Sequence, residues 1–243
     1  MRVSTPPAGR LGRRAELSEN LDAVHARIAA ACASAGRSAG EVTLIAVTKT
    51  FPVSDIRLLS ELGVTDVGEN KDQDAAVKAA ECASLGLPLS WHFVGQLQVN
   101  KCASVVRYAD VIHSVDRPRL VTALGSRARA AGRVITCLLQ ISLDGDARRG
   151  GILAADAAAL AAAVAGESGL TLGGVMAIAP LGAAPVAAFG RLGEIAQQVR
   201  AAYPAATIIS AGMSGDLEQA IAAGATHVRI GTALLGGRQA FVR

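Results

Sequence analysis

The chain alternates short apolar segments with helical segments eight times, and this alternation limits its possible folds more than any other feature. Most of the apolar segments are rich in β-branched residues and end at glycine, proline or a polar residue, which is typical of buried strands. The predicted strands span residues 42–49, 65–68, 89–94, 110–115, 133–143, 170–178, 206–210 and 227–230.

Helical patterns follow each of these strands. The predicted helices span residues 53–62, 70–85, 99–108, 117–131, 154–165, 185–202, 214–223 and 232–238. Strands that alternate with helices imply a parallel sheet with helical crossovers. Eight such repeats in 243 residues match the size of a (β/α)8 barrel. We therefore predict an α/β protein with a (β/α)8 TIM barrel, and a doubly wound open sheet is the alternative.

An extra helix precedes the first strand. Ser18 can cap its start, and Gly36 can end it. Its apolar face is formed by Leu17, Leu21, Val24 and Ile28, which are spaced four, three and four residues apart. Residues 1–14 have four arginines, no acid and no apolar periodicity, which predicts a flexible basic tail. We expect residues 15–243 to form a single barrel domain.

Composition excludes several classes of protein. The net charge of +4 lies entirely in residues 1–14, so the neutral remainder has no nucleic-acid footprint. No apolar run is long enough to span a membrane, and no signal peptide is evident. Four widely spaced cysteines predict buried or free thiols in a reducing cytoplasm, and no metal site. The cysteines are Cys32, Cys82, Cys102 and Cys137.

Lys49 ends the first predicted strand, which is almost wholly apolar. Thr50, Phe51 and Pro52 follow it, and proline stops the strand there. Burial of an amine at such a position disfavours its charged form and makes it a nucleophile for an aldehyde, with which it forms a Schiff base. The alternative is a lysine that extends its amine from the strand end into solvent.

Two glycine-bearing turns follow the seventh and eighth predicted strands. Gly212, Met213 and Ser214 lie in one, and Gly231 and Thr232 lie in the other. Glycine lets the backbone approach a ligand closely, and the amides of a helix N-terminus bind anions. Barrels often bind phosphate with the loops after strands seven and eight. The sequence favours a phosphate site, and the alternative is that the glycines only make turns and Ser214 only caps a helix.

Two more strand ends bear polar side chains. Arg229 ends the eighth strand, where it can meet a phosphate or an aromatic nitrogen. Its alternative role is an ion pair with Glu69 or Asp66. Asn70 offers a donor and an acceptor close to Lys49, and asparagine is also a common helix cap.

The histidines of the predicted strands are weaker candidates. His92 lies inside a strand, where a hydrogen-bonded core histidine is at least as well supported as a catalytic one. The case for His113 is weaker still. The chain has two tyrosines, Tyr108 and Tyr203, and both are assigned to the predicted helices or their ends, away from the strand ends.

Together these residues make the chain resemble the pyridoxal-phosphate homeostasis proteins, which are single-domain relatives of the N-terminal barrel of bacterial alanine racemase. The matching stretches are residues 44–49, 68–70, 92–101, 174–178, 212–216 and 228–233. They occur in one order between about residues 41 and 238, and this combination is highly specific.

The resemblance implies a pyridoxal 5'-phosphate cofactor held as an internal aldimine on Lys49. It implies phosphate contacts from Ser214, and it puts Arg229 near the pyridine nitrogen or the phosphate. An arginine at that nitrogen would keep its proton and weaken the cofactor as an electron sink. The implied cofactor-binding residues are Lys49, Asn70, Met213, Ser214, Arg229, Gly231 and Thr232.

The chain departs from the family pattern at two places. The family usually has an aromatic residue after Gly-Glu-Asn, whereas Lys71 and Asp72 follow here. In the loop after strand five the family often has a lysine, whereas Arg148 and Arg149 stand here. Arginine forms no stable aldimine, so a cofactor-handling role of that lysine does not transfer to this chain.

The resemblance implies a protein of intracellular pyridoxal-phosphate homeostasis with little or no turnover. Its expected partners are the cofactor and pyridoxal-phosphate-dependent apoenzymes, and we expect a monomer. One alternative is an amino-acid racemase, which needs a second base that a tyrosine of an additional domain supplies in the racemases. A less favoured alternative is a Schiff-base aldolase in which Lys49 attacks a sugar phosphate directly.

Overall fold

A closed parallel barrel forms the centre of the molecule. The structure is a computed structural model that describes residues 8–146, 149–180, 182 and 184–237. The strands follow one another around the barrel in sequence order, and β1 pairs with both β2 and β8. The predicted TIM barrel is confirmed, and the open sheet is wrong because no strand is left at an edge. The strands are β1 (Thr43–Val47), β2 (Asp66–Glu69), β3 (Ser90–Phe93), β4 (Val111–Val115), β5 (Ile135–Gln140), β6 (Leu170–Met176), β7 (Ile208–Ser210) and β8 (His227–Ile230).

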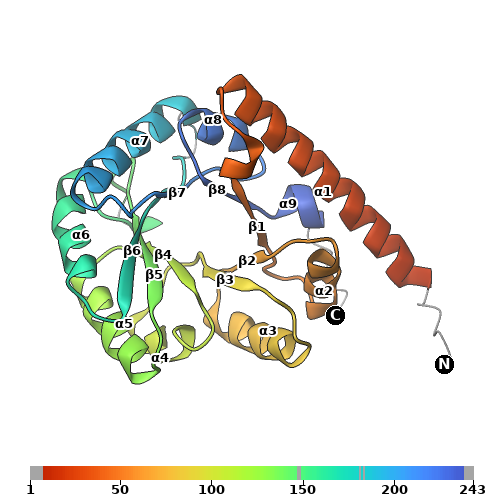
Figure 1. Ribbon diagram of the computed structural model, residues 1–243, viewed down its shortest axis with the longest axis horizontal. Coiled ribbons are helices and arrows are strands. Elements are labelled where there is room, and N and C mark those ends of the chain that lie inside the picture. The colour runs from red at the N-terminus through yellow and green to blue at the C-terminus, as the bar shows by residue number, and fades with distance from the viewer. Residues whose placement is uncertain (1–7, 147–148, 181, 183, 238–243) are drawn as a thin grey trace.

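The helices form an outer ring around these strands (Figure 1). The predicted helix 185–202 coincides with α7, which has proline in its first turn. The predicted helix 99–108 is shorter, because a 3-10 turn, η2 (Val99–Lys101), precedes α4. The helices are α1 (Ala8–Ser34), α2 (Val53–Glu61), α3 (Asp72–Ser84), α4 (Cys102–Val105), α5 (Pro118–Ala130), α6 (Ala157–Ala165), α7 (Pro185–Ala202), α8 (Leu217–Ala222) and α9 (Thr232–Leu235), with 3-10 turns η1 (Ala39–Glu41) and η4 (Ala154–Asp156).

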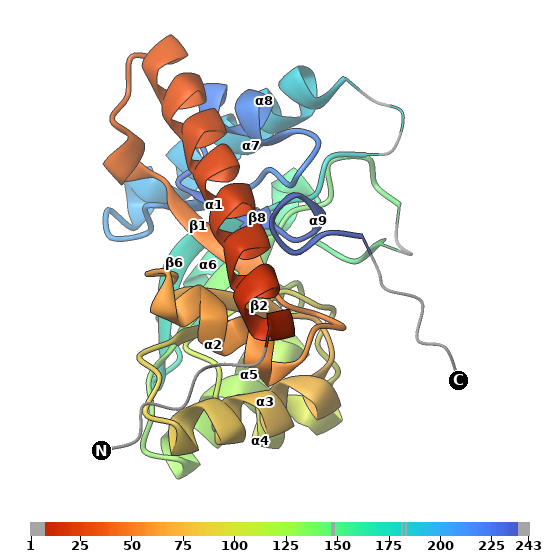
Figure 2. The same cartoon turned by 90° about the vertical axis from the view of Figure 1, so that its right-hand side faces the viewer.

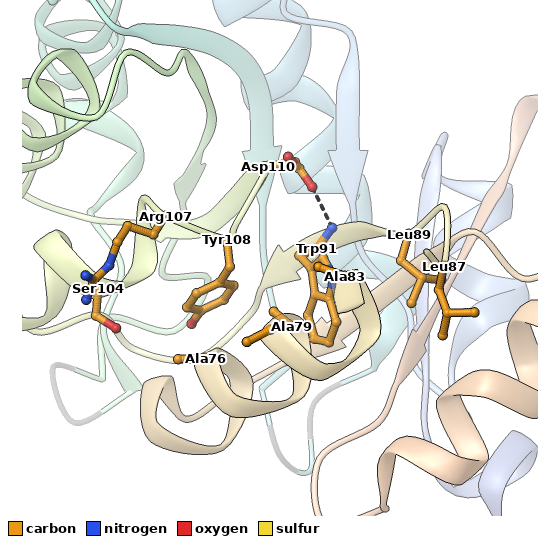
Figure 3. A pocket seen from close by; sticks show the side chains of 11 residues that line it. Ala76, Ala79, Ala83, Leu87, Leu89, Trp91, Ser104, Arg107, Tyr108 and Asp110 are labelled. Carbon is orange, nitrogen blue, oxygen red and sulfur yellow. Dashed lines mark hydrogen bonds between the residues drawn. The ribbon is translucent and has the colours of Figure 1, made fainter. Parts of the chain in front are cut away.

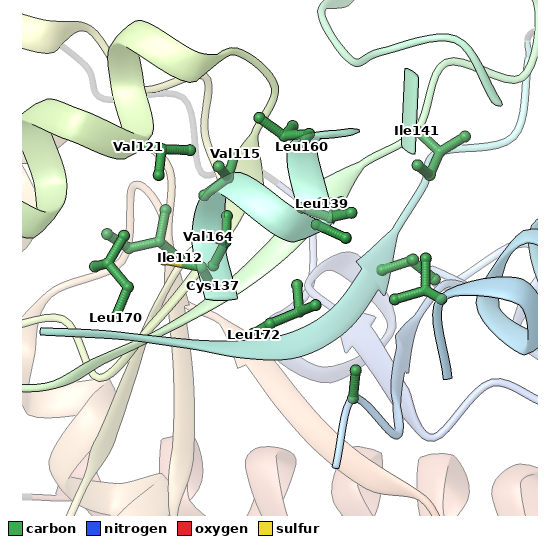
Figure 4. Packing of buried hydrophobic residues seen from close by; sticks show 14 of the residues in the cluster. Ile112, Val115, Val121, Cys137, Leu139, Ile141, Leu160, Val164, Leu170 and Leu172 are labelled. Atoms are coloured by element: carbon green, nitrogen blue, oxygen red, sulfur yellow. The ribbon is translucent and has the colours of Figure 1, made fainter. Parts of the chain in front are cut away.

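Apolar side chains fill the layer between the strands and this outer ring. In Figure 4, Ile112 of β4 and Leu139 of β5 lie against Val164 of α6. Full burial of such a side chain contributes about 1.5–3 kcal/mol to the free energy of unfolding. We call this layer, made of the three buried apolar clusters, the shell. It holds the helices against the barrel.

The interior of the barrel, by contrast, contains polar side chains. His113 of β4 lies 3.0 Å from the hydroxyl of Ser210 on β7, and both side chains are fully buried. Because β4 and β7 are not neighbours in the barrel, their side chains can meet only across its interior. Barrels of this type usually fill that space with Val, Ile and Leu. The polar filling is therefore a feature of this chain that needs an explanation.

Helix α1 begins at Ala8, well before Ser18, which therefore does not cap its start. The predicted flexible tail is wrong from residue 8 onwards, and residues 1–7 lie outside the described residues. Gly36 ends the helix as predicted, with a φ of 67° and a hydrogen bond from the Arg37 amide to the Cys32 carbonyl. The predicted apolar face is confirmed: Leu17, Leu21, Val24 and Ile28 are all buried.

Helix α1 lies beside α8 and α9, the last elements of the chain (Figure 2), and its polar side chains bond to them. Each donates a hydrogen bond to a backbone carbonyl of α8, α9 or the loop before α8, and we call these bonds the α1 ties. The donors Arg13, Asn20 and Arg27 bind the carbonyls of Leu235, Leu234 and Ser214, respectively, and Arg37, just after the end of α1, binds that of Ile221. Arg13 also forms an ion pair of 2.8 Å with Asp55 of α2. These bonds hold α1 against the rest of the molecule from Arg13 onwards, which explains why the helix begins well before its apolar face.

The four cysteines are buried and free, as predicted. Burial raises the pKa of Cys82 and of Cys102 to about 11, so both stay protonated at neutral pH and are poor nucleophiles. Among the described residues, no group of three or more His, Cys, Asp or Glu side chains could hold a metal ion. No helix in the described part of the chain is long and apolar enough to cross a membrane.

Candidate functional site

Lys49 lies two residues beyond the end of β1, at the rim formed by the carboxyl ends of the strands, which we call the mouth. The Phe51 amide bonds the Thr48 carbonyl at 3.0 Å, and Thr50 between them has a φ of 71°. This tight turn stops the strand and places the Lys49 side chain in solvent. The predicted burial of its amine is wrong for this structure, and the alternative of a solvent-exposed amine is confirmed.

The residue before Lys49 is fixed by a buried polar network behind the strand. Thr48 donates a hydrogen bond of 2.7 Å to Glu69 of β2, whose carboxylate also pairs with Lys78 of α3 at 2.6 Å. Lys78 donates a second bond of 2.9 Å to the Thr48 carbonyl. The seven-residue spacing of Lys71 and Lys78 in the sequence predicts that both lie on one solvated face of a helix. That prediction is wrong for Lys78, because Lys71 precedes α3 and only Lys78 faces the sheet.

Asn70 follows β2 and is half-buried at the mouth. A Cβ atom on Gly95, which follows β3, would lie 2.1 Å from the Asn70 carbonyl oxygen. Only glycine allows this close approach, so Gly95 fixes the position of Asn70. Asn70 lines a cavity of about 400 Å³ together with residues that include Phe93 and Lys101.

The turn after β7 requires glycine at one position. Gly212 has a φ of 90°, and a Cβ atom there would lie 2.7 Å from the Ala220 side chain. The turn continues with Met213, whose amide donates a 2.6 Å hydrogen bond to Asp216. Met213 is 39% exposed at the mouth. Close packing against α8 is thus one reason for glycine at this position, and the close approach to a ligand stays a prediction.

Ser214 joins the two glycine-bearing turns. It does not cap the following helix, because α8 begins three residues later at Leu217. Its hydroxyl instead accepts a hydrogen bond of 3.2 Å from the Ala233 amide, in the first turn of α9. Gly231 and Thr232 begin that turn, so the two predicted phosphate-binding segments lie together. The tie from Arg27 to the Ser214 carbonyl, 3.0 Å long, holds this arrangement from behind.

Arg229 points inward from β8 and is 5% exposed. Its Nη1 donates to the Ser210 hydroxyl at 2.6 Å, and its Nη2 donates to the Ala177 carbonyl at 2.9 Å. Burial lowers the pKa of Arg229 to about 10, and the charge of Asp216 opposes this shift. The guanidinium therefore remains a cation at neutral pH.

The direct ion pair proposed for Arg229 is wrong. Glu69 pairs with Lys78 on the outer side of the sheet, and Asp66 bonds to His92 at 2.9 Å. His92 and His113 are buried and hydrogen-bonded within the barrel, which supports their interpretation as core histidines.

The loop after β5 is fixed by Arg149, which stands where the family often has lysine. Its guanidinium bonds to Asp144 and to the Ala179 carbonyl, each at 2.9 Å. Arg149 thus links the loop after β5 to the loop after β6. Arg148 lies outside the described residues.

The structure brings the predicted residues together around one part of the mouth. Lys49 follows β1, Arg229 and Gly231 belong to β8 and its end, and β1 pairs with β8 through Ala46 and Ile230. A Cβ atom on Gly231 would lie 3.6 Å from the Val47 side chain. Ser210 ends a predicted strand and Lys78 falls in a predicted helix, but sequence analysis assigned a role to neither, because only their partners on other elements reveal what they do.

The tyrosines lie away from this part of the molecule. Tyr108 packs edge-to-face against Trp91, with ring centroids 6.3 Å apart, in a cavity of about 560 Å³ between α3 and α4 (Figure 3). Burial raises the pKa of Tyr108 far above its usual value. Tyr203 follows the end of α7. Within the described residues, no tyrosine hydroxyl is available at the mouth as a second base.

Comparison with known proteins gives a consistent set of relatives. Residues 20–239 match the family model of the alanine racemase N-terminal domain. The pyridoxal phosphate homeostasis protein of Mycobacterium tuberculosis is 44% identical, over 93% of this chain and 95% of the relative. The protein of that name from Escherichia coli is 40% identical, over 92% of this chain and 97% of the relative. The structure of PipY from Synechococcus elongatus with PLP bound is 34% identical, with a TM-score of 0.79, and the match covers 90% of this chain and 100% of PipY.

Proposed function

Because the chain belongs to the family of pyridoxal phosphate homeostasis proteins, within the alanine racemase N-terminal domain family, we propose that it binds pyridoxal 5'-phosphate at the mouth of its barrel. The observation that best supports this site is the gathering of an exposed lysine, a buried arginine and two joined glycine-bearing turns on β1, β8 and β7. The cofactor has an aldehyde, which the Lys49 amine can bind covalently, and a phosphate, which the two glycine-bearing turns can bind.

Lys49 holds the aldehyde covalently in this proposal. Its amine has no hydrogen-bond or ion-pair partner among the described residues, so no internal bond must break before it reacts. The network of Thr48, Glu69 and Lys78 fixes the backbone beneath it, which limits the directions that the side chain can take. Asn70, on the neighbouring strand end, lies beside the ring.

Met213, Ser214, Gly231 and Thr232 hold the phosphate. The hydroxyl of Ser214 and the amides of Gly231 and Thr232 at the start of α9 are neutral hydrogen-bond donors, which suits an anion. The Ser214–Ala233 bond sets their spacing in advance. Arg229 is proposed to face the ring nitrogen, where a cation stays protonated and gives the ring no proton.

Binding with little or no turnover is favoured over racemisation. A racemase needs bases on both faces of the ring, and the positions of Tyr108 and Tyr203 provide no second base at the mouth. A Schiff-base aldolase would use the same lysine without the cofactor. If pyridoxal phosphate binds to Lys49, the aldolase is excluded and the cofactor-binding role is supported. An assay of amino-acid racemisation then distinguishes a binding protein from a racemase.

The homeostasis role implies transfer of the cofactor to pyridoxal-phosphate-dependent apoenzymes as partners. We propose that the chain acts as a monomer in the cytoplasm, where its four free thiols stay reduced. To test these partners, protein loaded with pyridoxal phosphate is mixed with an apoenzyme, and recovery of that enzyme's activity shows that the cofactor was transferred. The molecular mass from sedimentation shows whether the protein is a monomer.

The decisive experiment is borohydride reduction followed by peptide mapping. We expect the pyridoxyl group on Lys49, and we expect Lys49→Ala to abolish both this adduct and the visible absorbance. Lys71→Ala is the matched control, because Lys71 is also an exposed lysine near the mouth but is predicted to make no adduct. A pyridoxyl group on Lys71, Lys78 or Lys101 would overturn the assignment.

The phosphate site has its own test. Pyridoxal without phosphate should bind at least about tenfold more weakly, because each charge-assisted hydrogen bond contributes about 1.5–3 kcal/mol. Ser214→Ala should reduce the difference between the two ligands. Equal affinities for pyridoxal and pyridoxal phosphate would contradict the site.

A further inference from the structure

A row of five side chains crosses the interior of the barrel from β2 to β8. Asp66 Oδ1 lies 2.9 Å from His92 Nε2, and His92 Nδ1 lies 2.9 Å from His113 Nε2. His113 Nδ1 lies 3.0 Å from Ser210 Oγ, which accepts a 2.6 Å hydrogen bond from Arg229. We call these five residues the relay. They join Asp66 at the start of β2 to the proposed cofactor site.

The chemistry of the two ends fixes the direction of every hydrogen bond between them. A guanidinium only donates and a carboxylate only accepts. With neutral rings, the proton of His92 lies on Nε2 toward Asp66, and the proton of His113 lies on Nε2 toward His92. His113 Nδ1 is then an acceptor, which the hydroxyl proton of Ser210 satisfies. All bonds therefore point from Arg229 to Asp66.

Burial favours a neutral imidazole at His113. His113 is completely buried, and burial, followed by the charges of His92 and Arg229, lowers the pKa of His113 well below its usual value. His227 of β8 lies on the same side, with its ring centroid 6.3 Å from that of His92. Burial also lowers the pKa of His227, to about 4. The charged groups at the two ends of the row are Arg229 and Asp66.

We propose that Asp66, His92, His113 and Ser210 are positioning residues for Arg229, acting as a one-way hydrogen-bond relay that fixes the guanidinium and connects its charge to the Asp66 carboxylate. The role in cofactor binding rests on the proposed function. Arg229 has five N–H groups and donates two of them within the protein, through Nη1 and Nη2. The other N–H groups of Arg229 keep a fixed direction. A donor held in this way loses little conformational entropy when it bonds to the ring nitrogen of the cofactor.

Asp66 is the best point at which to test the relay, because its side chain is 20% exposed and four residues separate its effect from the ligand. Asp66→Leu removes the last acceptor, whereas Asp66→Asn keeps an acceptor oxygen for His92. Leu138→Ala is the matched control: Leu138 is a fully buried apolar strand residue outside the shell clusters, and its truncation weakens the barrel without removing any hydrogen-bond partner of the relay.

Ring-nitrogen NMR of the ligand-free protein at pH 7 gives the first readout. We expect both His92 and His113 as neutral Nε2–H tautomers in the wild type, in Asp66→Asn and in Leu138→Ala. In Asp66→Leu we expect a mixture of tautomers at both rings, including His113, which Asp66 does not touch. A protonated ring, an Nδ1–H tautomer in the wild type, or an unchanged His113 in Asp66→Leu would overturn the relay.

Titration with pyridoxal phosphate gives the second readout. We expect Asp66→Leu to weaken binding about tenfold, which corresponds to one charge-assisted hydrogen bond, and Asp66→Asn to recover most of it. Leu138→Ala should lower the melting temperature without changing the ligand's absorption band. If the tautomers are as expected but Asp66→Leu binds like the wild type, the positioning role is overturned and the cofactor site remains.

The two proposals can fail separately. If wild-type protein forms no adduct with pyridoxal phosphate, the proposed function fails, while the NMR spectra still decide the relay. If the adduct forms on Lys49 but the tautomers are reversed, the relay fails and the binding site remains.

Discussion

The two faces of the barrel strands differ in what they bury. On β4, Ile112 lies in the apolar shell and its neighbour His113 lies in the polar interior; on β8, Val228 and Arg229 alternate in the same way. Successive residues of a strand point to opposite faces, so each strand serves both layers. The shell needs only apolar volume. The interior needs a specific partner for each polar atom, because an unpaired buried polar group costs about 1–3 kcal/mol.

Some buried polar atoms do bear such a cost. Glu69 Oε2, Ser114 Oγ and Gln219 Oε1 are buried and have no hydrogen-bond partner among the described residues. Glu69 supports the residue before Lys49, Ser114 follows His113 on β4, and Gln219 belongs to α8. Two of these three uncompensated atoms thus lie next to residues of the proposed site or of the barrel interior.

The largest expected effect lies in the shell. Leu139→Ala removes a fully buried side chain from the largest cluster and should lower the free energy of unfolding by about 2–5 kcal/mol. Denaturant unfolding measures this loss. Val134→Ala is the control: Val134 is 66% exposed just before β5, and its change should stay within about 0.5 kcal/mol. Equal effects of the two variants would mean that the shell does not provide the stability.

The next effect comes from the interior and depends on pH. His113 and His227 have pKa values below the unfolded value of about 6.5, because burial disfavours their charged forms. Below pH 6.5 the unfolded chain binds protons that the folded chain does not, so stability falls as pH falls. The slope is up to about 1.4 kcal/mol per pH unit for each ring. For His227 the effect ends near pH 4.

Unfolding titrations between pH 8 and pH 4 measure this slope. His227→Gln should flatten it, whereas substitution of the exposed His25 by glutamine should leave it unchanged. A flat profile in the wild type would show that the buried rings bind protons in the folded state as easily as in the unfolded state.

The smallest effect concerns the α1 ties, which lie outside both layers. Arg13→Ala removes the ion pair with Asp55 and the bond to the Leu235 carbonyl, both partly buried. We expect a loss of about 1–2 kcal/mol, or a fall in melting temperature of about 2–8 °C. The exposed Arg14 is the matched control and should be neutral when changed to alanine. Similar melting temperatures for both variants would mean that the tie contributes no stability.

Much of the fold follows from local pattern. The strand and helix alternation predicted the barrel, and the spacing of Leu17 and Leu21 predicted the buried face of α1. The start of α1 was missed because residues 8–14 have no apolar periodicity of their own. Their order depends on contacts such as Arg13 with Asp55, forty-two residues away, which no local signal reveals.

The candidate site was predicted less completely. Strand-end positions identified Lys49, Ser214 and Arg229, since the barrel gathers these ends at one mouth. The burial of Lys49 was wrong because the strand stops two residues earlier than the apolar run suggested. The relay was missed because Ser210 and His113 meet across the barrel, and sequence pattern gives the face of a strand but not the opposite partner.

The α1 ties also bear on how the chain folds during synthesis. Arg13 and Leu235 are 222 positions apart, and Arg27 and Ser214 are 187 apart. The apolar face of α1 packs against Leu217, Ile221 and Leu234, so it has no complete partner until the last elements leave the ribosome. Contacts between such distant segments form slowly. We therefore expect α1 to be the region of the nascent chain that most needs protection from aggregation by a chaperone.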